Sequence, residues 1–149
     1  MMRNNFIGKV FTTNNSKETQ KLAYDFAKTL GTGETICLYG DLGSGKTTFT
    51  QGLAEGLGIK GRIISPTFVI IRSHELKNGM FYHVDLYRTE TEKDIENLGL
   101  EEIVNDSRNI TVIEWAEKLM DFLLKKRIEI EFVNEKENVR KIVFRSLNQ

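Results

Sequence analysis

Residues 40–47 read GDLGSGKT and match GxxxxGK[ST], the pattern of a phosphate-binding loop or P-loop. Gly40 and Gly45 lack a Cβ atom, so the backbone can turn tightly and approach an anion closely. Backbone N–H groups of such a loop, and of the helix that follows it, point at the β-phosphate of a nucleotide. Lys46 adds a positive charge for the β- and γ-phosphates, and the Thr47 hydroxyl is an oxygen ligand for Mg²⁺. The predicted nucleotide-binding residues of this stretch are Gly40, Asp41, Leu42, Gly43, Ser44, Gly45, Lys46, Thr47 and Thr48.

The residues on either side favour a P-loop over the alternative, a glycine-rich turn with a surface lysine. Ile36–Tyr39 is a short apolar run, typical of the strand that precedes such a loop. After the loop, Phe49, Leu53 and Leu57 recur every four residues, the spacing of a helix with one buried face. The sequence therefore predicts a strand, a P-loop and a helix in succession.

The whole pattern predicts one α/β domain over residues 1–149, large enough for a hydrophobic core. Asn15 and Glu18 begin a helix that we expect to end at Gly31. Asn78-Gly79 predicts a hairpin with residues 80–86 as its return strand. The other expected strands are 6–11, 62–64, 68–71, 110–113, 127–132 and 139–145, and the other helices are 91–105, broken at Gly99, and 116–124. The predicted fold is a three-layer, P-loop NTPase-like domain with a mixed, mostly parallel central sheet and an antiparallel hairpin.

Composition limits the possible classes of function. Lys and Arg number 21, as do Asp and Glu, so the zero net charge argues against a protein that mainly holds nucleic acid by its phosphates. The basic run Lys125–Arg127 is of the kind that usually ends a solvated helix. Cys37 is the single cysteine, which excludes a disulfide framework. With no signal peptide and no apolar segment near the ~18 residues of a membrane span, we expect a cytoplasmic protein without membrane contact.

Two carboxylates follow apolar strands and are candidates for the chemistry of phosphoryl transfer. Asp85 ends the run 81–84, and Glu114 ends the run 110–113. Because α/β sheets bind ligands at the carboxyl ends of their strands, either residue could hold Mg²⁺, directly or through water, or polarise an attacking water. The alternative for each is a solvated or capping carboxylate, but two of them in a P-loop protein favour function.

Four further residues have open interpretations. Thr67 lies where Ser65-Pro66-Thr67 interrupts an apolar run, and is either a nucleotide-ordered switch residue or an ordinary turn threonine. His83 shares a strand face with Asp85, although a hydrogen-bonded histidine at the surface or rim is the commoner arrangement. Arg88 is either a phosphate contact or a salt-bridged loop residue. Trp115 is interpreted either as a residue that packs within the fold or as part of a surface that a partner covers.

The absence of two motifs limits further which class of nucleotide-binding protein the sequence can encode. The sequence has no N-K-x-D tetrapeptide for reading guanine, which disfavours a GTPase and makes ATP the expected nucleotide. It has no Arg-rich lid of the kind that small-molecule kinases close over ATP. A small-molecule kinase and a non-catalytic, ATP-dependent binding module remain as the alternatives to an ATPase.

Four motifs together resemble the TsaE family, bacterial ATPases of tRNA threonylcarbamoyladenosine synthesis. The motifs are GDLGSGKTT at 40–48, SPTF at 65–68, YHVDLYR at 82–88 and IEWAEKL at 113–119. Their order and spacing match the family over about residues 35–119. A P-loop alone is unspecific, whereas SPT[FY] followed by a DLYR block and an EW pair is far more specific.

This resemblance implies a protein that binds ATP and Mg²⁺, hydrolyses ATP slowly, and acts with the partner proteins TsaD and TsaB. It implies contact with tRNA only indirectly, through the complex. Carried over by motif, Asp85 is the Walker-B-type acid, Glu114 a second acid that can ligate Mg²⁺, and Thr67 part of a switch-like loop. The implied catalytic residues are Lys46, Thr67, Asp85 and Glu114, and the implied metal ligands are Thr47, Asp85 and Glu114. Segments near both termini bound the nucleotide base in this family, and Thr13 is our candidate for the N-terminal one.

Overall fold

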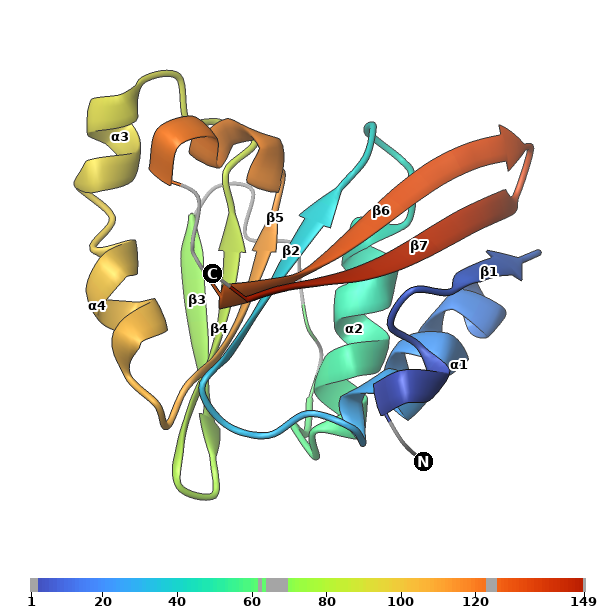
Figure 1. Cartoon of the computed structure of the whole chain (residues 1–149), viewed down its shortest axis with the longest axis horizontal. Coiled ribbons are helices and arrows are strands. Elements are labelled where there is room, and N and C mark those ends of the chain that lie inside the picture. The colour runs from blue at the N-terminus through green and yellow to red at the C-terminus, as the bar shows by residue number, and fades with distance from the viewer. Residues whose placement is uncertain (1–2, 62, 64–69, 123–125, 149) are drawn as a thin grey trace.

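A seven-stranded mixed sheet forms the centre of the computed structural model, which describes residues 3–61, 63, 70–122 and 126–148. The strand order is β1-β7-β6-β2-β5-β4-β3 (Figure 1). The neighbours β6–β2, β2–β5 and β5–β4 are parallel, and the other three pairs are antiparallel. The predicted mixed sheet with an antiparallel hairpin is confirmed, although only half of its pairings are parallel. The strands are β1 Val10–Thr13, β2 Glu34–Tyr39, β3 Ile71–Leu76, β4 Gly79–Asp85, β5 Ile110–Glu114, β6 Lys126–Lys136 and β7 Val139–Asn148.

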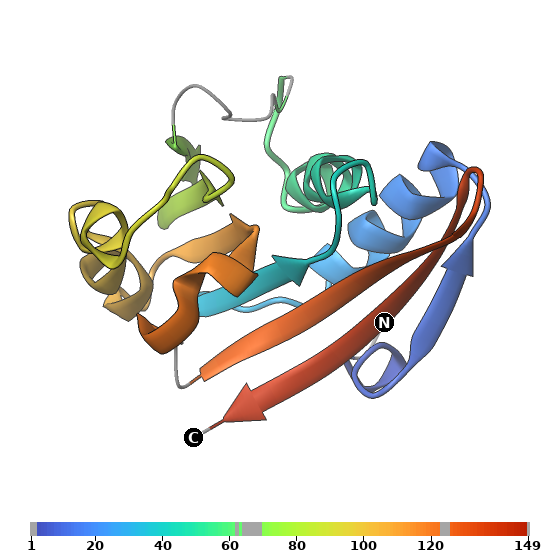
Figure 2. The ribbon, with the colours of Figure 1, turned by 90° about the horizontal axis from the view of Figure 1, so that it is seen from above.

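Helices cover both faces of the sheet, which gives the expected three layers. On one face, α1 and α2 lie side by side (Figures 1 and 2) and pack on alternate residues of β2, Ile36 and Leu38. On the other face, Cys37 of β2 packs in a second cluster with Ile95, Leu100 and Leu119 of three other helices. Strand β2 is therefore buried on both sides, as its continuous apolar run indicates. The helices are α1 Ser16–Ala27, α2 Lys46–Gly56, α3 Glu92–Glu96, α4 Leu100–Asn105, and the 3₁₀ turns η1 Arg3–Asn5 and η2 Ala116–Phe122.

Helix α1 begins as predicted but ends earlier than predicted. The Asn15 side chain accepts a hydrogen bond from the Glu18 N–H at 2.9 Å and caps the helix. The helix ends at Ala27, and Gly31 lies outside it. The Thr29 hydroxyl donates to the Phe26 carbonyl at 2.7 Å, so a side chain takes an acceptor that a continuing helix would use.

The N-terminal strand also differs from its prediction. The strand occupies Val10–Thr13 instead of residues 6–11, because residues 3–5 form a 3₁₀ turn that directs Phe6 inward. Phe6 is 4% exposed and stacks edge-on against Phe26, with ring centroids 5.4 Å apart. An aromatic contact between distant segments thus overrides the local alternation of the sequence.

The remaining connections follow the sequence closely. Residues 77–78 link β3 to β4, and a Cβ atom at Gly79 would lie 2.0 Å from the Arg108 carbonyl oxygen, so only glycine fits there. Gly99 has φ 71° and separates α3 from α4, as predicted. The expected short helix at 116–124 is observed as a 3₁₀ helix over residues 116–122. The expected strand at 62–64 and the Ser65–Thr67 interruption lie almost entirely outside the described residues.

In the part of the chain that the structure describes, every helix is too short or too polar to cross a membrane.

Candidate functional site

Three parallel strands end together beside the P-loop and carry the candidate side chains to one edge of the sheet. Strand β2 ends at Tyr39, directly before the loop, β5 ends at Glu114, and β4 ends at Asp85. In the ladder, Glu114 lies opposite Leu38 on one side and opposite Asp85 on the other. The topology therefore confirms that the two acids meet the P-loop at the carboxyl edge of the sheet.

The P-loop backbone depends on its first and third glycines. At Gly40, with φ 147°, a Cβ atom would lie 2.8 Å from both the Phe132 carbonyl oxygen and the Ser44 hydroxyl. Gly45 adopts φ 104° as the N-cap of α2, a left-handed conformation that L side chains rarely take. The loop therefore turns directly into the helix, and the first N–H groups of α2 are free of a capping side chain.

Lys46 is buried beneath the loop and is surrounded by electron-rich groups. Its Nζ donates to the Gly40 carbonyl and, at 2.9 Å, to the Asp41 carbonyl. The same Nζ lies 4.0 Å from the ring centroid of Trp115, a cation–π contact. Burial lowers the pKa of Lys46, an effect that the charges of Glu117 and Glu114 oppose. Lys46 thus places a desolvated positive charge inside the phosphate loop, where it acts strongly on an anion.

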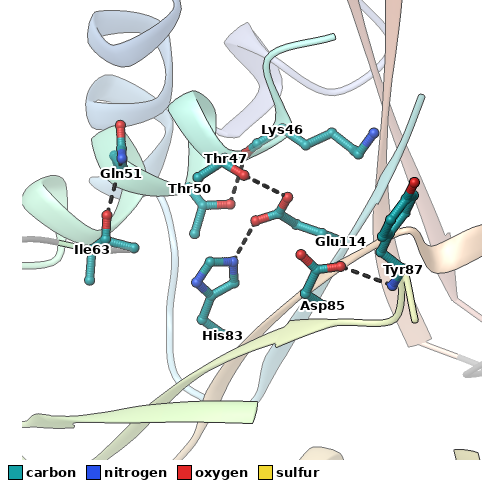
Figure 3. Close-up of polar contacts among 9 residues, drawn as sticks. All are labelled: Lys46, Thr47, Thr50, Gln51, Ile63, His83, Asp85, Tyr87 and Glu114. Carbon is teal, nitrogen blue, oxygen red and sulfur yellow. Dashed lines mark hydrogen bonds and ion pairs between the residues drawn. The ribbon is translucent and has the colours of Figure 1, made fainter. Parts of the chain in front are cut away.

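Glu114 holds the P-loop threonine. The Thr47 hydroxyl donates to Glu114 Oε1 at 3.0 Å, and Glu114 is 2% exposed (Figure 3). Its other oxygen, Oε2, accepts from His83 Nε2. A hydroxyl that donates its hydrogen to a carboxylate keeps its lone pairs for a metal ion. This pair therefore fits the oxygen-rich environment that Mg²⁺ requires.

Asp85 lies close to Glu114 in the ladder but has a different partner. Asp85 Oδ1 accepts from the Tyr87 N–H at 2.9 Å, within a turn after β4 (Figure 3). Asp85 is 5% exposed and lines the same cavity as Thr47. The acid in contact with Thr47 is Glu114, whereas the motif comparison favoured Asp85 as the Walker-B-type residue.

A cavity of about 290 Å³ joins these groups. The cavity contains every P-loop residue from Leu42 to Thr48, which were predicted to bind phosphate and metal. It also contains the two acids, Asp85 and Glu114, and three residues that the sequence analysis did not assign to the nucleotide. The cavity is lined by Leu42, Gly43, Ser44, Gly45, Lys46, Thr47, Thr48, Asp85, Tyr87, Glu114, Trp115 and Arg140. Trp115 has φ 59°, a strained value for a bulky residue, and its ring lies 5.0 Å from that of Tyr87.

Arg140 is a residue of this cavity that sequence reasoning missed. It lies on β7, about 100 residues after the P-loop, and donates from Nη2 to the Gly43 carbonyl at 3.0 Å. It also lines a second cavity of about 320 Å³ between the start of α1 and the P-loop. No local pattern indicates this contact, because it depends on the pairing of the C-terminal hairpin with β2.

Three predicted residues, Gly40, Asp41 and Thr13, do not line the cavity of about 290 Å³, and a fourth lies outside the described residues. Thr13 is 4% exposed, and its hydroxyl shares a hydrogen bond with the Thr19 hydroxyl at 2.7 Å, beneath the second cavity. It lines neither cavity, so its contact with a nucleotide base stays a prediction. Thr67 lies outside the described residues.

The described residues contain no group of three or more His, Cys, Asp or Glu side chains that could hold a metal ion. Mg²⁺ in nucleotide sites commonly uses one or two protein oxygens together with phosphates and water. Thr47 and Glu114 fit that smaller donor set.

Comparison with known proteins identifies the family. The sequence profile described as "Threonylcarbamoyl adenosine biosynthesis protein TsaE" matches residues 13–142. The chain belongs to the TsaE family. The tRNA threonylcarbamoyladenosine biosynthesis protein TsaE of Bacillus subtilis is 39% identical over 132 residues, covering 89% of this chain and 82% of that protein. The TsaE protein of Streptomyces coelicolor is 42% identical over 114 residues, 74% of this chain and 76% of that protein.

The fold agrees with a solved structure of similar sequence. The crystal structure of Bacillus subtilis YdiB superposes with a TM-score of 0.79 at 31% identity, covering 94% of this chain and 86% of that chain. The TsaE profile extends past Arg140, so the family match contains both acids, the P-loop, β6 and the start of β7.

Proposed function

We propose that this TsaE-family protein is a Mg²⁺-dependent ATPase that acts in tRNA threonylcarbamoyladenosine modification. The observation that supports this most directly is the contact between Thr47 and Glu114, 3.0 Å apart, in a cavity that the P-loop and Lys46 share. A buried acid next to the P-loop hydroxyl is what distinguishes a nucleotide site with a metal from a simple anion site.

The chemistry proposed is in-line attack of water on the γ-phosphate. The loop amides and Lys46 bind the phosphates and stabilise the negative charge that develops on them. Thr47 and Glu114 would hold Mg²⁺, which when bound neutralises charge on the β- and γ-phosphates. In this proposal Asp85, which accepts a hydrogen bond from the Tyr87 N–H at the same edge of the sheet, orients the attacking water.

The biological setting rests on the family. Relatives bear the name tRNA threonylcarbamoyladenosine biosynthesis protein TsaE, and the resemblance implies TsaD and TsaB as partners. A net charge of zero supports indirect contact with tRNA, because holding it alone would require a cationic surface. In this proposal, ATP state changes how the loop that contains Thr67 is presented to the partners.

The test is ATP hydrolysis by the purified chain, alone and with TsaD and TsaB, beside Lys46→Ala and Glu114→Ala. We expect slow hydrolysis that rises with the partners and falls at least about 100-fold in both variants. Lys60→Ala, which removes an exposed lysine beyond α2, is the control for a lost charge. Fast hydrolysis independent of partners, or rates indifferent to both substitutions, would refute the proposal. Phosphate transfer to a small metabolite would instead identify a kinase.

A further inference from the structure

His83 is fully buried, at 0% exposure, and lies behind the nucleotide site instead of on its rim. The sequence interpretation of a surface or rim histidine is wrong in this respect, because β4 lies between β5 and β3, and Phe81, two residues earlier on the same face, packs in the hydrophobic core. The imidazole Nε2 contacts Glu114 Oε2, on the side of the carboxylate away from Thr47 (Figure 3).

We infer that His83 is a positioning residue that fixes the orientation of Glu114 toward Thr47 and the metal. The inference rests on the proposed function, and it adds a residue that does not itself touch nucleotide. A carboxylate on a flexible side chain can rotate, and a rotation would either exchange the oxygen that faces Thr47 or move both oxygens away from it. With Oε2 held by His83, only Oε1 faces Thr47, at 3.0 Å. Glu114 then offers one defined oxygen to the cavity.

The ring has a definite tautomer in this arrangement. A carboxylate oxygen accepts, so the shared hydrogen lies on Nε2 of the imidazole. His83 Nδ1 is buried and has no hydrogen-bond partner among the described residues. In the Nε2–H tautomer, Nδ1 carries a lone pair and no hydrogen. A buried lone pair without a partner is tolerated better than a buried N–H without one, so this tautomer also suits the surroundings of Nδ1.

A purely structural role would not require an imidazole at this position. The neighbouring inward residues of the layer, Phe81 and Val112, are apolar and fully buried. An aliphatic side chain would therefore fill the space at a lower desolvation cost than His83. Among the described residues, Glu114 is the one hydrogen-bond partner of the His83 side chain, so the polarity of the imidazole serves that carboxylate.

The test compares His83→Leu with His83→Gln, which keeps an N–H donor near the position of Nε2. Thr111→Val is the matched control, since it removes from the adjacent strand another buried polar atom that has no hydrogen-bond partner among the described residues. Binding of a fluorescent ATP analogue is titrated with Mg²⁺, alongside kcat and KM for hydrolysis. We expect His83→Leu to raise the Mg²⁺ concentration for half-maximal binding by about 10- to 100-fold and to lower kcat. His83→Gln should recover most of both, and Thr111→Val should match wild type.

Three outcomes would overturn the inference. In the first, His83→Leu lowers stability but keeps the wild-type Mg²⁺ requirement and kcat per folded molecule. In the second, His83→Gln fails to improve on His83→Leu. The third outcome applies if His83→Leu does not fold, and it is read from the ¹H–¹⁵N spectrum of the two histidines of the wild-type protein with Mg²⁺ and ATP. An Nδ1–H tautomer at His83 in that spectrum would overturn the inference. Loss of the proposed function itself is recognised separately, by nucleotide binding that Lys46→Ala leaves unchanged.

Discussion

The two helices on one face of the sheet meet at glycine, and substitution of Gly52 tests that packing. A Cβ atom at Gly52 would lie 2.3 Å from the Gln20 carbonyl oxygen and 2.7 Å from the Gln20 Cα. One turn later, a Cβ atom at Gly56 would lie 2.6 Å from the Tyr24 carbonyl oxygen. Helices α1 and α2 therefore contact each other backbone to backbone, and Gly52→Ala is expected to force them apart.

The expected change in the free energy of unfolding of Gly52→Ala follows from two opposing effects. In an isolated helix, replacing an interior glycine by alanine would stabilise by about 1 kcal/mol. Here the new Cβ meets backbone, which cannot rotate away, and ordinary contact begins at 3.4 Å, so α1 must move by about 1 Å. Overpacking of this kind costs up to about 3 kcal/mol. The expected net loss is about 2 kcal/mol, or about 4–8 °C in Tm for a domain of this size.

Thermal and urea unfolding followed by circular dichroism measure this loss. Gly31→Ala is the matched control, because its added Cβ would meet nothing within 4 Å and its φ is not in the left-handed region. That variant should be neutral or stabilised by up to about 1 kcal/mol. If Gly52→Ala were stabilised to the same extent as Gly31→Ala, the close approach of α1 and α2 would be refuted.

Three further outcomes test the capping, the core and a surface turn. Asn15→Ala should lose about 1 kcal/mol of unfolding free energy in urea, because the Glu18 N–H loses its acceptor; an unchanged midpoint would contradict the cap. Burial raises the pKa of Cys37 to about 12, so a disulfide reagent at pH 8 should modify it only after unfolding, and rapid modification of the folded protein would contradict its burial. Hydrogen bonds from Arg108 lower the pKa of Asp106 from 3.8 to about 2. The stabilising effect of the ionised Asp106 carboxylate is present above about pH 4 and is lost as the pH falls through about 2, so the stability difference between wild type and Asp106→Asn should shrink over this range and disappear only below pH 2.

The parts of the fold that local chemistry determines were predictable from the sequence. Asn15 as a helix cap, Gly99 as a break and the alternation of residues 127–132 each depend on neighbours within a few positions. The error at the N-terminal strand arises where a distant segment decides, because Phe6 leaves its predicted strand to reach the aromatic core. The early end of α1 has a local cause that the spacing of apolar residues does not report: the Thr29 hydroxyl competes for the Phe26 carbonyl.

The candidate site likewise contains residues that the local sequence predicts and contacts that depend on distant parts of the chain. Lys46 and Thr47 belong to a motif of eight residues, and the strand-end rule indicates Glu114 and Asp85 without a structure. The sequence could not show which acid contacts Thr47, since that depends on β5, and not β4, lying next to β2. Arg140 reaches the P-loop only through the pairing of β6 with β2, a relation that no local spacing reports.

The contacts of Glu114 also explain how β5 keeps its register, although aliphatic residues lie on both faces of the strand. Val112 packs toward α1 and α2, and Ile113 packs in the opposite cluster. A shift by one residue would exchange two similar apolar faces at little cost in burial. It would also carry Glu114 away from Thr47 and His83 and leave a carboxylate without partners in an apolar layer, which costs about 3–5 kcal/mol. The polar contacts that we assign to nucleotide chemistry therefore also specify the pairing of the strand that carries them.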